Sequence, residues 1–177
     1  MKKPFVYLIT VILILLLIIV FSIFPINSYQ QVDRNMLDVV LIDLFNENLS
    51  DANYYGITCF YVSIDGQDID KCFAASFNNP IRTTKVKPFS ESYKIDTKNI
   101  GIDSLAFLPE YRILVRDIKT NERGIQFELI THKDKNNSYS VKVYTYAGGL
   151  FSSEKIYTLE KKYNIWMLVD KKLKWIS

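Results

Sequence analysis

The N-terminal hydrophobic segment constrains this chain more than any other feature of its sequence. Residues Phe5–Ile26 carry no charged side chain and read FVYLITVILILLLIIVFSIFPI. As a helix, these 22 residues would span roughly 33 Å, close to the roughly 30 Å hydrocarbon core of a bilayer. A helix satisfies its own backbone hydrogen bonds and can therefore cross lipid. We expect a single transmembrane anchor over residues 5–26.

The charges that flank this segment predict its orientation. Lys2 and Lys3 precede it, and Arg34 is the first basic residue after it. Basic residues collect on the cytoplasmic side of a membrane span. We therefore expect residues 1–4 in the cytoplasm, a connector at residues 27–32, and a domain at residues 33–177 that is periplasmic or extracellular.

A cleaved signal peptide is the alternative interpretation of the same segment. Signal peptides have an apolar core of about 7–15 residues and a cleavage site with small residues. The apolar run here is longer, and the sequence after it, FPINSYQQ, lacks an A-x-A-like pattern. An uncleaved anchor is favoured, and both interpretations place the domain outside the cytoplasm.

The charge balance of the domain argues against nucleic acid as a partner. The net charge is +3, but without Lys2 and Lys3 the chain has 20 basic and 19 acidic residues. Binding to nucleic acid usually requires a concentrated basic patch. The aromatic fraction of 14% supplies enough large apolar side chains for a folded core. We expect one globular domain after the anchor.

The first half of the domain is predicted to fold as helix, strand, helix. Asp33 is expected to cap an amphipathic helix that ends near Asn53, with apolar residues at helical spacing: Leu37, Val40, Leu41, Leu44 and Phe45. A strand follows at Thr58–Ile64 and ends at Asp65-Gly66. Asp68 is expected to cap a second, short helix, whose shared face consists of Ile69, Cys72, Phe73, Ser76 and Phe77.

The second half is predicted to form an antiparallel β-meander. After a short strand near Thr84–Val86 and irregular structure beyond Pro88, five runs have strand character: Tyr111–Ile118, Ile125–His132, Ser138–Tyr146, Lys155–Lys162 and Ile165–Val169. The short polar turns between them imply neighbouring antiparallel strands. The last run is apolar on both faces, so we expect it to be central or covered twice. The predicted fold class is α+β, with a curved meander.

This order of elements resembles the cone-shaped cystatin-like folds grouped with nuclear transport factor 2. The ending YTLEKKYNIWMLVDKKLKWIS is similar to the closing hairpin of bacterial extracytoplasmic members. Those members often have Gly one position before the Trp near the turn, where this chain has Asn164-Ile165-Trp166. Because Asn tolerates positive φ, the turn can still form. The group includes enzymes, ligand binders and assembly scaffolds, so the resemblance implies a fold and no single function.

The two cysteines, Cys59 and Cys72, allow two interpretations. Outside the cytoplasm a disulfide between them is permitted, and it would close a short loop between strand and helix. Two separate thiols that pack as small hydrophobes are the other interpretation. Sequence spacing does not give the geometry that decides between them.

Several polar residues are of types that could take part in chemistry, but each has a simpler structural explanation. His132 is the single histidine and is expected near an exposed strand end. Asp65, Asp68 and Asp70 lack the spacing of a calcium loop and are expected in a turn and a helix cap. No spacing pairs the carboxylates of the irregular region, which are Glu91, Asp96, Asp103 and Glu110. We predict no catalytic residue, metal site or cofactor.

Two further groups of residues suggest surfaces. Lysines near the C-terminus could meet an anionic lipid surface or an acidic partner, although solvated strand ends are the usual role: Lys161, Lys162, Lys171, Lys172 and Lys174. Aromatic residues on the meander could line a pocket, although core packing is their usual role: Tyr139, Tyr144, Tyr146, Tyr157 and Trp166.

These features favour a non-enzymatic, single-pass membrane protein. Its extracytoplasmic domain is expected to bind a protein or act as a scaffold in the cell envelope. The layout also resembles that of inner-membrane scaffold proteins of type IV secretion systems. A binder of small apolar ligands inside the cone is the alternative, and an enzyme of the cyclase or isomerase kind is less favoured because it needs an acid–base pair.

Overall fold

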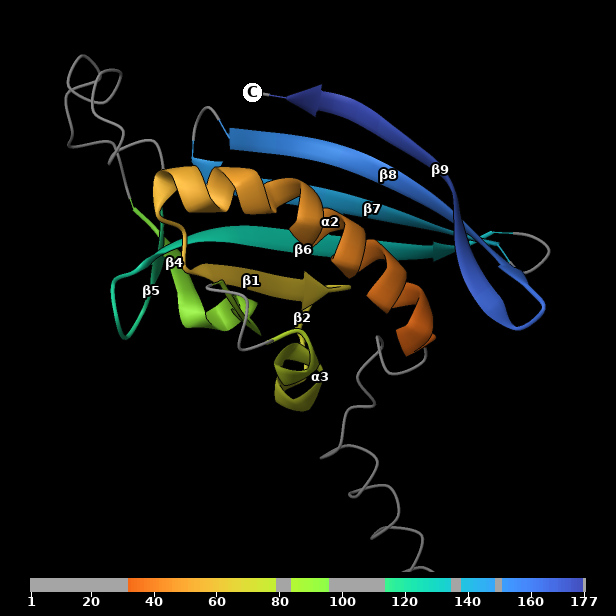
Figure 1. The fold of residues 1–177 in the computed structure, drawn as a ribbon, viewed down its shortest axis with the longest axis horizontal. Helices are drawn as coiled ribbons and strands as arrows, with labels where there is room; N and C mark the ends of the chain where they lie inside the picture. Colours follow the sequence, from red (N-terminus) through yellow and green to blue (C-terminus); the bar gives the residue numbers. More distant parts are fainter. Residues whose placement is uncertain (1–31, 79–83, 96–113, 135–137, 149–150, 177) are drawn as a thin grey trace, which may run out of the picture.

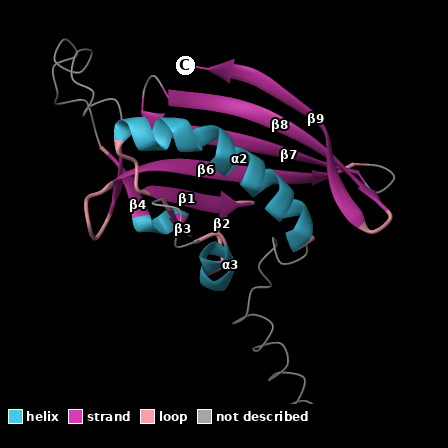
Figure 2. Cartoon of the chain, in the orientation of Figure 1, coloured by secondary structure: helices cyan, strands magenta, loops and turns pink. Residues whose placement is uncertain are grey.

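A computed structural model of the chain describes residues 32–78, 84–95, 114–134, 138–148 and 151–176. These residues form an α+β fold in which one long helix lies across one face of an open, curved sheet (Figures 1 and 2). The sheet is mixed but largely antiparallel, and it ends in a C-terminal meander. The predicted fold class is confirmed at this level.

The long helix α2 (Arg34–Tyr55) begins where the sequence predicts and ends two residues beyond the expected Asn53. Asp33 is its N-cap and accepts a hydrogen bond of 3.1 Å from the backbone N–H of Asn35. Gly56, at a φ of 64°, ends the helix in the left-handed conformation that glycine adopts without strain. The predicted apolar face is buried against the sheet: Leu37, Val40, Leu41, Leu44 and Phe45.

Strand β1 (Cys59–Ile64) is confirmed, and a tight turn at Asp65-Gly66 leads into the short strand β2 (Gln67–Asp68). Both turn residues have positive φ, as a two-residue hairpin requires. The helix α3 (Lys71–Ser76) therefore begins later than expected, and Asp70, not Asp68, caps it. Asp68 instead accepts the backbone N–H of Ser90.

The predicted face of α3 was partly wrong. Phe73 and Phe77 are buried, whereas Cys72 and Ser76 are exposed. The helix has six residues, and the helix-like spacing from Ile69 onward includes residues that precede it. A face drawn from that spacing therefore joins residues that do not share a helical surface.

The middle of the chain is more regular than expected. Strand β3 (Lys85–Pro88) confirms the predicted strand near Thr84–Val86 and runs parallel to β1. The expectation of irregular structure after Pro88 was wrong for residues 89–94, which form a 3₁₀ turn, η2 (Phe89–Glu91), and a strand, β4 (Ser92–Lys94); residues 96–113 lie outside the described residues. Strand β5 (Val115–Asp117) pairs with β4 and falls within the predicted run 111–118.

The meander consists of β6 (Arg123–Lys133), β7 (Ser138–Gly148), β8 (Phe151–Lys162) and β9 (Ile165–Ile176). Each strand is longer than predicted and pairs antiparallel with the next. Strand β6 runs parallel to β1, so the path through the sheet is β2-β1-β6-β7-β8-β9. The four predicted strands and their order are confirmed.

The predicted position of the last strand was wrong. Strand β9 was expected to be central or covered twice, but it lies at the sheet edge and, among the described strands, pairs with β8 alone. Its apolar residues Ile165, Met167 and Val169 are exposed. A strand that is apolar on both faces is usually buried, and here that pattern instead marks an uncovered edge.

The core lies between α2 and the inner face of the sheet. Phe45 of α2 stacks on Phe60 of β1 with ring centroids 5.1 Å apart, and Phe127 of β6 meets Phe60 edge-on at 5.3 Å. Val141, Tyr157 and Leu159 continue this layer under the N-terminal half of the helix. Packed side chains therefore fill most of the space between helix and sheet.

The expected anchor at residues 5–26 lies outside the described residues, as do Asp96, Asp103 and Glu110. Within the described ranges, no helix is both long enough and apolar enough to cross a bilayer.

Candidate functional site: a cleft between α2 and the sheet

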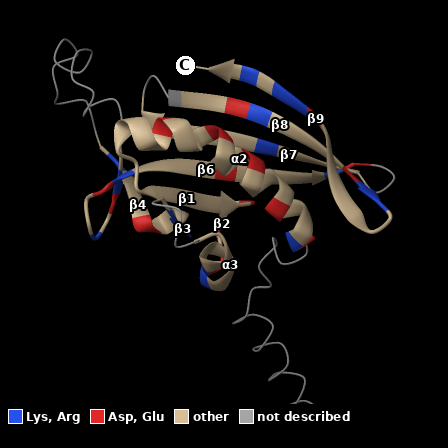
Figure 3. Cartoon of the chain, in the orientation of Figure 1, with Lys and Arg blue, Asp and Glu red and all other residues tan. Residues whose placement is uncertain are grey.

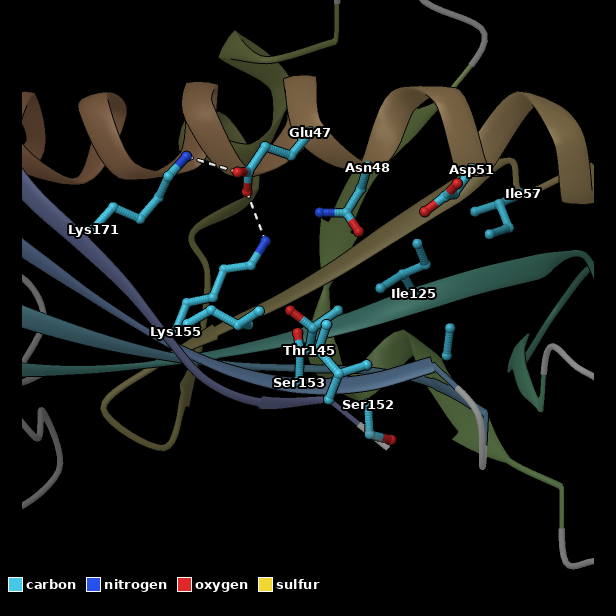
Figure 4. A pocket seen from close by; sticks show the side chains of 13 residues that line it. Glu47, Asn48, Asp51, Ile57, Ile125, Thr145, Ser152, Ser153, Lys155 and Lys171 are labelled. Atoms are coloured by element: carbon cyan, nitrogen blue, oxygen red, sulfur yellow. Dashed lines mark hydrogen bonds and ion pairs between the residues drawn. The ribbon is translucent and has the colours of Figure 1, made fainter.

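An open cleft of about 450 Å³ remains where the second half of α2 passes over β7, β8 and β9 (Figure 4). Glu47, Asn48 and Asp51 line it from the helix. Ser153 and Lys155 of β8 and Thr145 of β7 line it from the sheet. The volume falls within the range of small-molecule sites.

One wall of the cleft is a group of ion-paired side chains that joins the helix to the sheet. We call this group the clasp; it consists of Asp43, Glu47, Lys155 and Lys171. Glu47 accepts two hydrogen bonds of 2.7 Å, from Lys155 Nζ on Oε2 and from Lys171 Nζ on Oε1. Lys171 also bonds Asp43 Oδ2 at 2.8 Å. Lys171 comes from β9 and Lys155 from β8, so the clasp fixes the edge of the sheet to the helix.

The clasp keeps Glu47 and Lys171 charged. Burial alone would raise the pKa of Glu47, but the hydrogen bonds from Lys155 and Lys171 outweigh it and lower that pKa. The hydrogen bonds to Asp43 and Glu47 raise the pKa of Lys171. Beneath the clasp, burial and then the charges of Glu47 and Asp43 raise the pKa of Tyr157. Lys171 is therefore held as a cation, which makes it a poor general base near neutral pH.

The remaining lining of the cleft is largely apolar. Ile57, Ile125 and Ala147 form a buried floor. Leu173, 51% exposed, and Ile176, 69% exposed, form a rim that belongs to the edge strand β9. One border of the cleft is therefore an unpaired strand edge with exposed apolar side chains.

Thr145 provides the unsatisfied polar group of the cleft. Its side chain lies on the inner face of β7, between Phe127 of β6 and Ser153 of β8 in the strand register. The residue is 9% exposed, and its Oγ1 is buried and has no hydrogen-bond partner in the described part of the chain. Buried polar groups normally have partners, so this hydroxyl is free to bond to water or to a ligand in the open cleft.

The cleft side chains are suited to binding. Among the described residues that line it are hydroxyls, ion-paired lysines and carboxylates, and no histidine or cysteine. Nucleophilic catalysis needs a nucleophile activated by a neighbouring base. Nowhere in the described ranges do three or more His, Cys, Asp or Glu side chains form a group that could hold a metal.

The residues first considered for chemistry lie away from the cleft. His132 is exposed near the end of β6, with Nε2 3.8 Å from Asp134 Oδ1. Asp65 accepts the backbone N–H and the hydroxyl of Thr131, each at 2.7 Å, and Asp70 caps α3. These carboxylates bond to the protein itself, as the turn-and-cap interpretation predicts.

Four of the five lysines near the C-terminus make ion pairs, and Figure 3 marks the positions of the basic and acidic residues along the chain. Lys161 bonds Asp33, Lys162 bonds Glu160, and Lys172 bonds Asp170. Lys171 alone of this group reaches the cleft clasp. The meander aromatics divide as well: Tyr139, Tyr157 and Trp166 pack in or against the core, whereas Tyr144 and Tyr146 face the opposite side of the sheet.

Both cysteines are free thiols in the structure. Cys59 is buried with Tyr61 and Val115 on the outer face of the sheet. Cys72 is exposed on α3.

A second polar cluster, centred on Asp117 on the outer face of the sheet, stabilises the fold. Asp117 is almost fully buried and accepts four hydrogen bonds, from Tyr61 Oη, Lys87 Nζ and the backbone N–H groups of Lys119 and Thr120. Burial would raise the pKa of Asp117, but these donors lower it well below its usual range. The cluster fixes the turn between β5 and β6, and its carboxylate has no capacity left for a ligand.

Sequence reasoning did not find Glu47, Lys155 or Thr145. A local signal existed only for Thr145, which interrupts the apolar alternation of Val141, Val143 and Ala147 on β7. Glu47 and Lys155 meet across 108 residues, and no local pattern records such a pairing.

No protein-family model, curated protein or solved structure matches this chain. The resemblance to cystatin-like folds therefore stays a prediction.

Proposed function

We propose that this chain is a non-catalytic, membrane-anchored protein of the cell envelope whose domain binds a segment of a partner protein where the cleft meets β9. The observation that carries this proposal is the rim of the cleft, which is an edge strand with the exposed apolar residues Leu173 and Ile176. The long helix over a curved sheet is also compatible with a cystatin-like cone.

An edge strand offers a row of unpaired backbone N–H and C=O groups to an incoming strand. Soluble proteins usually protect such edges with charges, bulges or very short strands. Strand β9 has 12 residues and carries two of these protections, lysines and two register shifts in its pairing with β8, so the strand that adds to it has to match its charges. A partner strand added to β9 would gain backbone hydrogen bonds, and one of its side chains could enter the cleft to give specificity.

The charges of β9 indicate the chemistry of that segment. Lysines outnumber acidic residues along the strand; Lys171 is held in the clasp and Lys172 pairs with Asp170, so Lys174 is the β9 lysine without an ion pair among the described residues. A second copy of β9 would bring lysines together, which is unfavourable for directly opposed side chains. An extended segment that alternates acidic and apolar residues fits better, because its charges complement the lysines and its apolar residues cover Leu173.

Site-specific crosslinking in intact cells tests this proposal. A photoreactive residue at position 174 on β9 should yield one defined crosslinked partner, and the same residue at position 118 on the β5–β6 turn should not. Leu173→Asp should abolish the crosslink, whereas Ile118→Asp, a change at another exposed apolar residue, should leave it intact. An equal crosslink in both variants would contradict docking on β9.

The placement of the domain is tested separately by protease accessibility. In intact cells the domain should be digested from outside, and in inverted membranes it should be protected. Recovery of a full-length, membrane-bound chain supports the anchor. A shortened soluble product would instead support the cleaved signal peptide.

A small amphipathic molecule in the cleft is the second candidate, favoured by the unpartnered hydroxyl of Thr145 and by the volume of about 450 Å³. Native mass spectrometry of the purified full-length chain tests it. A bound molecule of discrete mass that Thr145→Val releases would support this candidate over a partner segment on β9.

A further inference from the structure

The hairpin between β8 and β9 is tied to the first residue of the domain. Lys161 Nζ and Trp166 Nε1 both bond Asp33 Oδ2, at 2.8 and 2.7 Å. These two residues flank the turn at positions 162–165, so the turn lies beside the N-terminus of α2. Figure 1 shows the hairpin and the start of α2 at the same end of the sheet.

The sequence before α2 limits how far this end can be from a membrane. If residues 5–26 form the anchor, only residues 27–32 connect it to Asp33. Six residues, fully extended, reach at most about 20 Å. The hairpin therefore lies near the bilayer surface, while the β5–β6 turn lies at the opposite end of the sheet.

The tip of the hairpin has the composition of a membrane-interface contact. Tyr163 is 99% exposed, Ile165 is 65% exposed, and the ammonium-bearing side chain of Lys162 is exposed beside them. Tyrosine is enriched at the headgroup level of bilayers. Lysine can lay its stem on apolar surface while its charge stays among the headgroups.

The backbone at the tip supports the same interpretation. Tyr163 and Asn164 have φ values of 50° and 65°. Asparagine and glycine adopt this left-handed region readily, but an aromatic residue does so at a cost. An exposed tyrosine at this position gains no burial within the domain in return, and strained residues of this kind collect at functional sites.

We propose that the tip of the β8–β9 hairpin, residues 162–165, rests in the headgroup layer of the membrane that holds the N-terminal anchor. The partner is a phospholipid surface, and the tethering distance and the exposed Tyr163 carry the assignment. This inference rests on the anchor proposed above. It orients the domain with the hairpin toward the bilayer and the β5–β6 turn away from it.

Fluorescence quenching in vesicles tests the contact with the full-length chain. The background is Cys72→Ser, since Cys72 is the exposed thiol and Cys59 is buried. An environment-sensitive fluorophore is attached at Lys162→Cys or, as the control, at Ile118→Cys. The chain is reconstituted in phosphatidylcholine and phosphatidylglycerol vesicles with nitroxide-labelled lipid. Quenching at position 162 should be at least about twofold that at position 118, as expected for a probe at the bilayer interface.

Tyr163→Asn tests the role of the aromatic ring, because asparagine keeps the turn conformation. In the Lys162→Cys chain it should lower the quenching toward that of position 118. Equal quenching at 162 and 118 in a chain that floats with the vesicles would overturn the hairpin contact and leave the anchor intact. Unchanged quenching after Tyr163→Asn would overturn the role of the ring, and failure of the chain to float would overturn both the anchor and the contact.

Discussion

The indole Nε1 of Trp166 donates a 2.7 Å hydrogen bond to Oδ2 of Asp33, a residue 133 positions earlier that also caps α2. Lys161 bonds the same oxygen at 2.8 Å. These bonds lower the pKa of Asp33 below its ordinary value of 3.8. One carboxylate thus joins the start of the helix to the last hairpin of the sheet.

Replacement of Asp33 should show how much these hydrogen bonds contribute to the free energy of unfolding. Asp33→Ala removes the cap and leaves the indole N–H of Trp166 without its acceptor, so it should cost about 2 kcal/mol or more of unfolding free energy. Asp33 caps α2 with Oδ1 and accepts from Trp166 with Oδ2, so Asp33→Asn keeps an oxygen for only one of the two bonds and should cost about 1 kcal/mol, less than the alanine variant. Denaturant unfolding of the full-length chain, followed by tryptophan fluorescence, gives both values. Equal losses would show that charge, not capping, dominates.

Tyr163 should show a conflict between stability and membrane contact. Tyr163→Gly relieves the left-handed strain at φ 50° and removes no buried surface, so it should raise the unfolding free energy by up to about 1 kcal/mol. The increase should be visible in thermal unfolding by circular dichroism. Ile42→Gly is the control, because Ile42 is also exposed but lies in the middle of α2, where glycine should cost about 1 kcal/mol or more. A loss of stability in Tyr163→Gly would contradict the strain at the turn.

Local patterns predicted much of this fold. Asp33 and the apolar spacing from Leu37 to Phe45 predicted α2, and short polar turns predicted the order of the meander strands. The turn at Asn164 forms despite the missing glycine. These features depend on residues close in sequence, where capping, periodicity and turn geometry act directly.

The errors have a common physical cause. The pattern of Ile165–Val169 records that both faces are apolar, but it does not record whether a neighbour covers them. Asp68 and Asp70 are equally good caps by sequence, and the β1–β2 hairpin decided between them. The clasp of Glu47 with Lys155 and Lys171 depends on long-range register, which local spacing does not encode.

That clasp should give the domain a measurable pH dependence. The pKa of Glu47 lies below its ordinary value of 4.5, so its contribution is present above about pH 4.5 and is lost as the pH falls below it. The pKa of Lys171 lies above 10.5, so its contribution is lost only as the pH rises beyond that value. Both side chains are partly exposed, so the whole effect should be about 1 kcal/mol.

Glu47→Gln measures the contribution of the clasp to the free energy of unfolding. Its deficit in unfolding free energy should be largest near neutral pH and should shrink as the pH falls below about 4.5. Glu160→Gln, which removes a more exposed pair with Lys162, should have a smaller effect at every pH. Denaturant unfolding at several pH values makes the comparison. A deficit of Glu47→Gln that stays constant into acid would mean that packing, not charge, holds the helix to β8 and β9.

Replacement of Thr145 tests whether its hydroxyl stabilises the fold or is available to a ligand. Its Oγ1 is buried without a partner in the described residues, so Thr145→Val removes an unsatisfied group and keeps the side-chain shape. The unfolding free energy should stay the same or rise by up to about 1 kcal/mol. Thr131→Val is the matched control, because that hydroxyl bonds Asp65 at 2.7 Å and its removal should cost about 1 kcal/mol. If Thr145→Val were as destabilising as Thr131→Val, its hydroxyl would already be satisfied in the free protein. The cleft would then lose its best polar anchor for a ligand, and docking on β9 would be favoured over a small molecule.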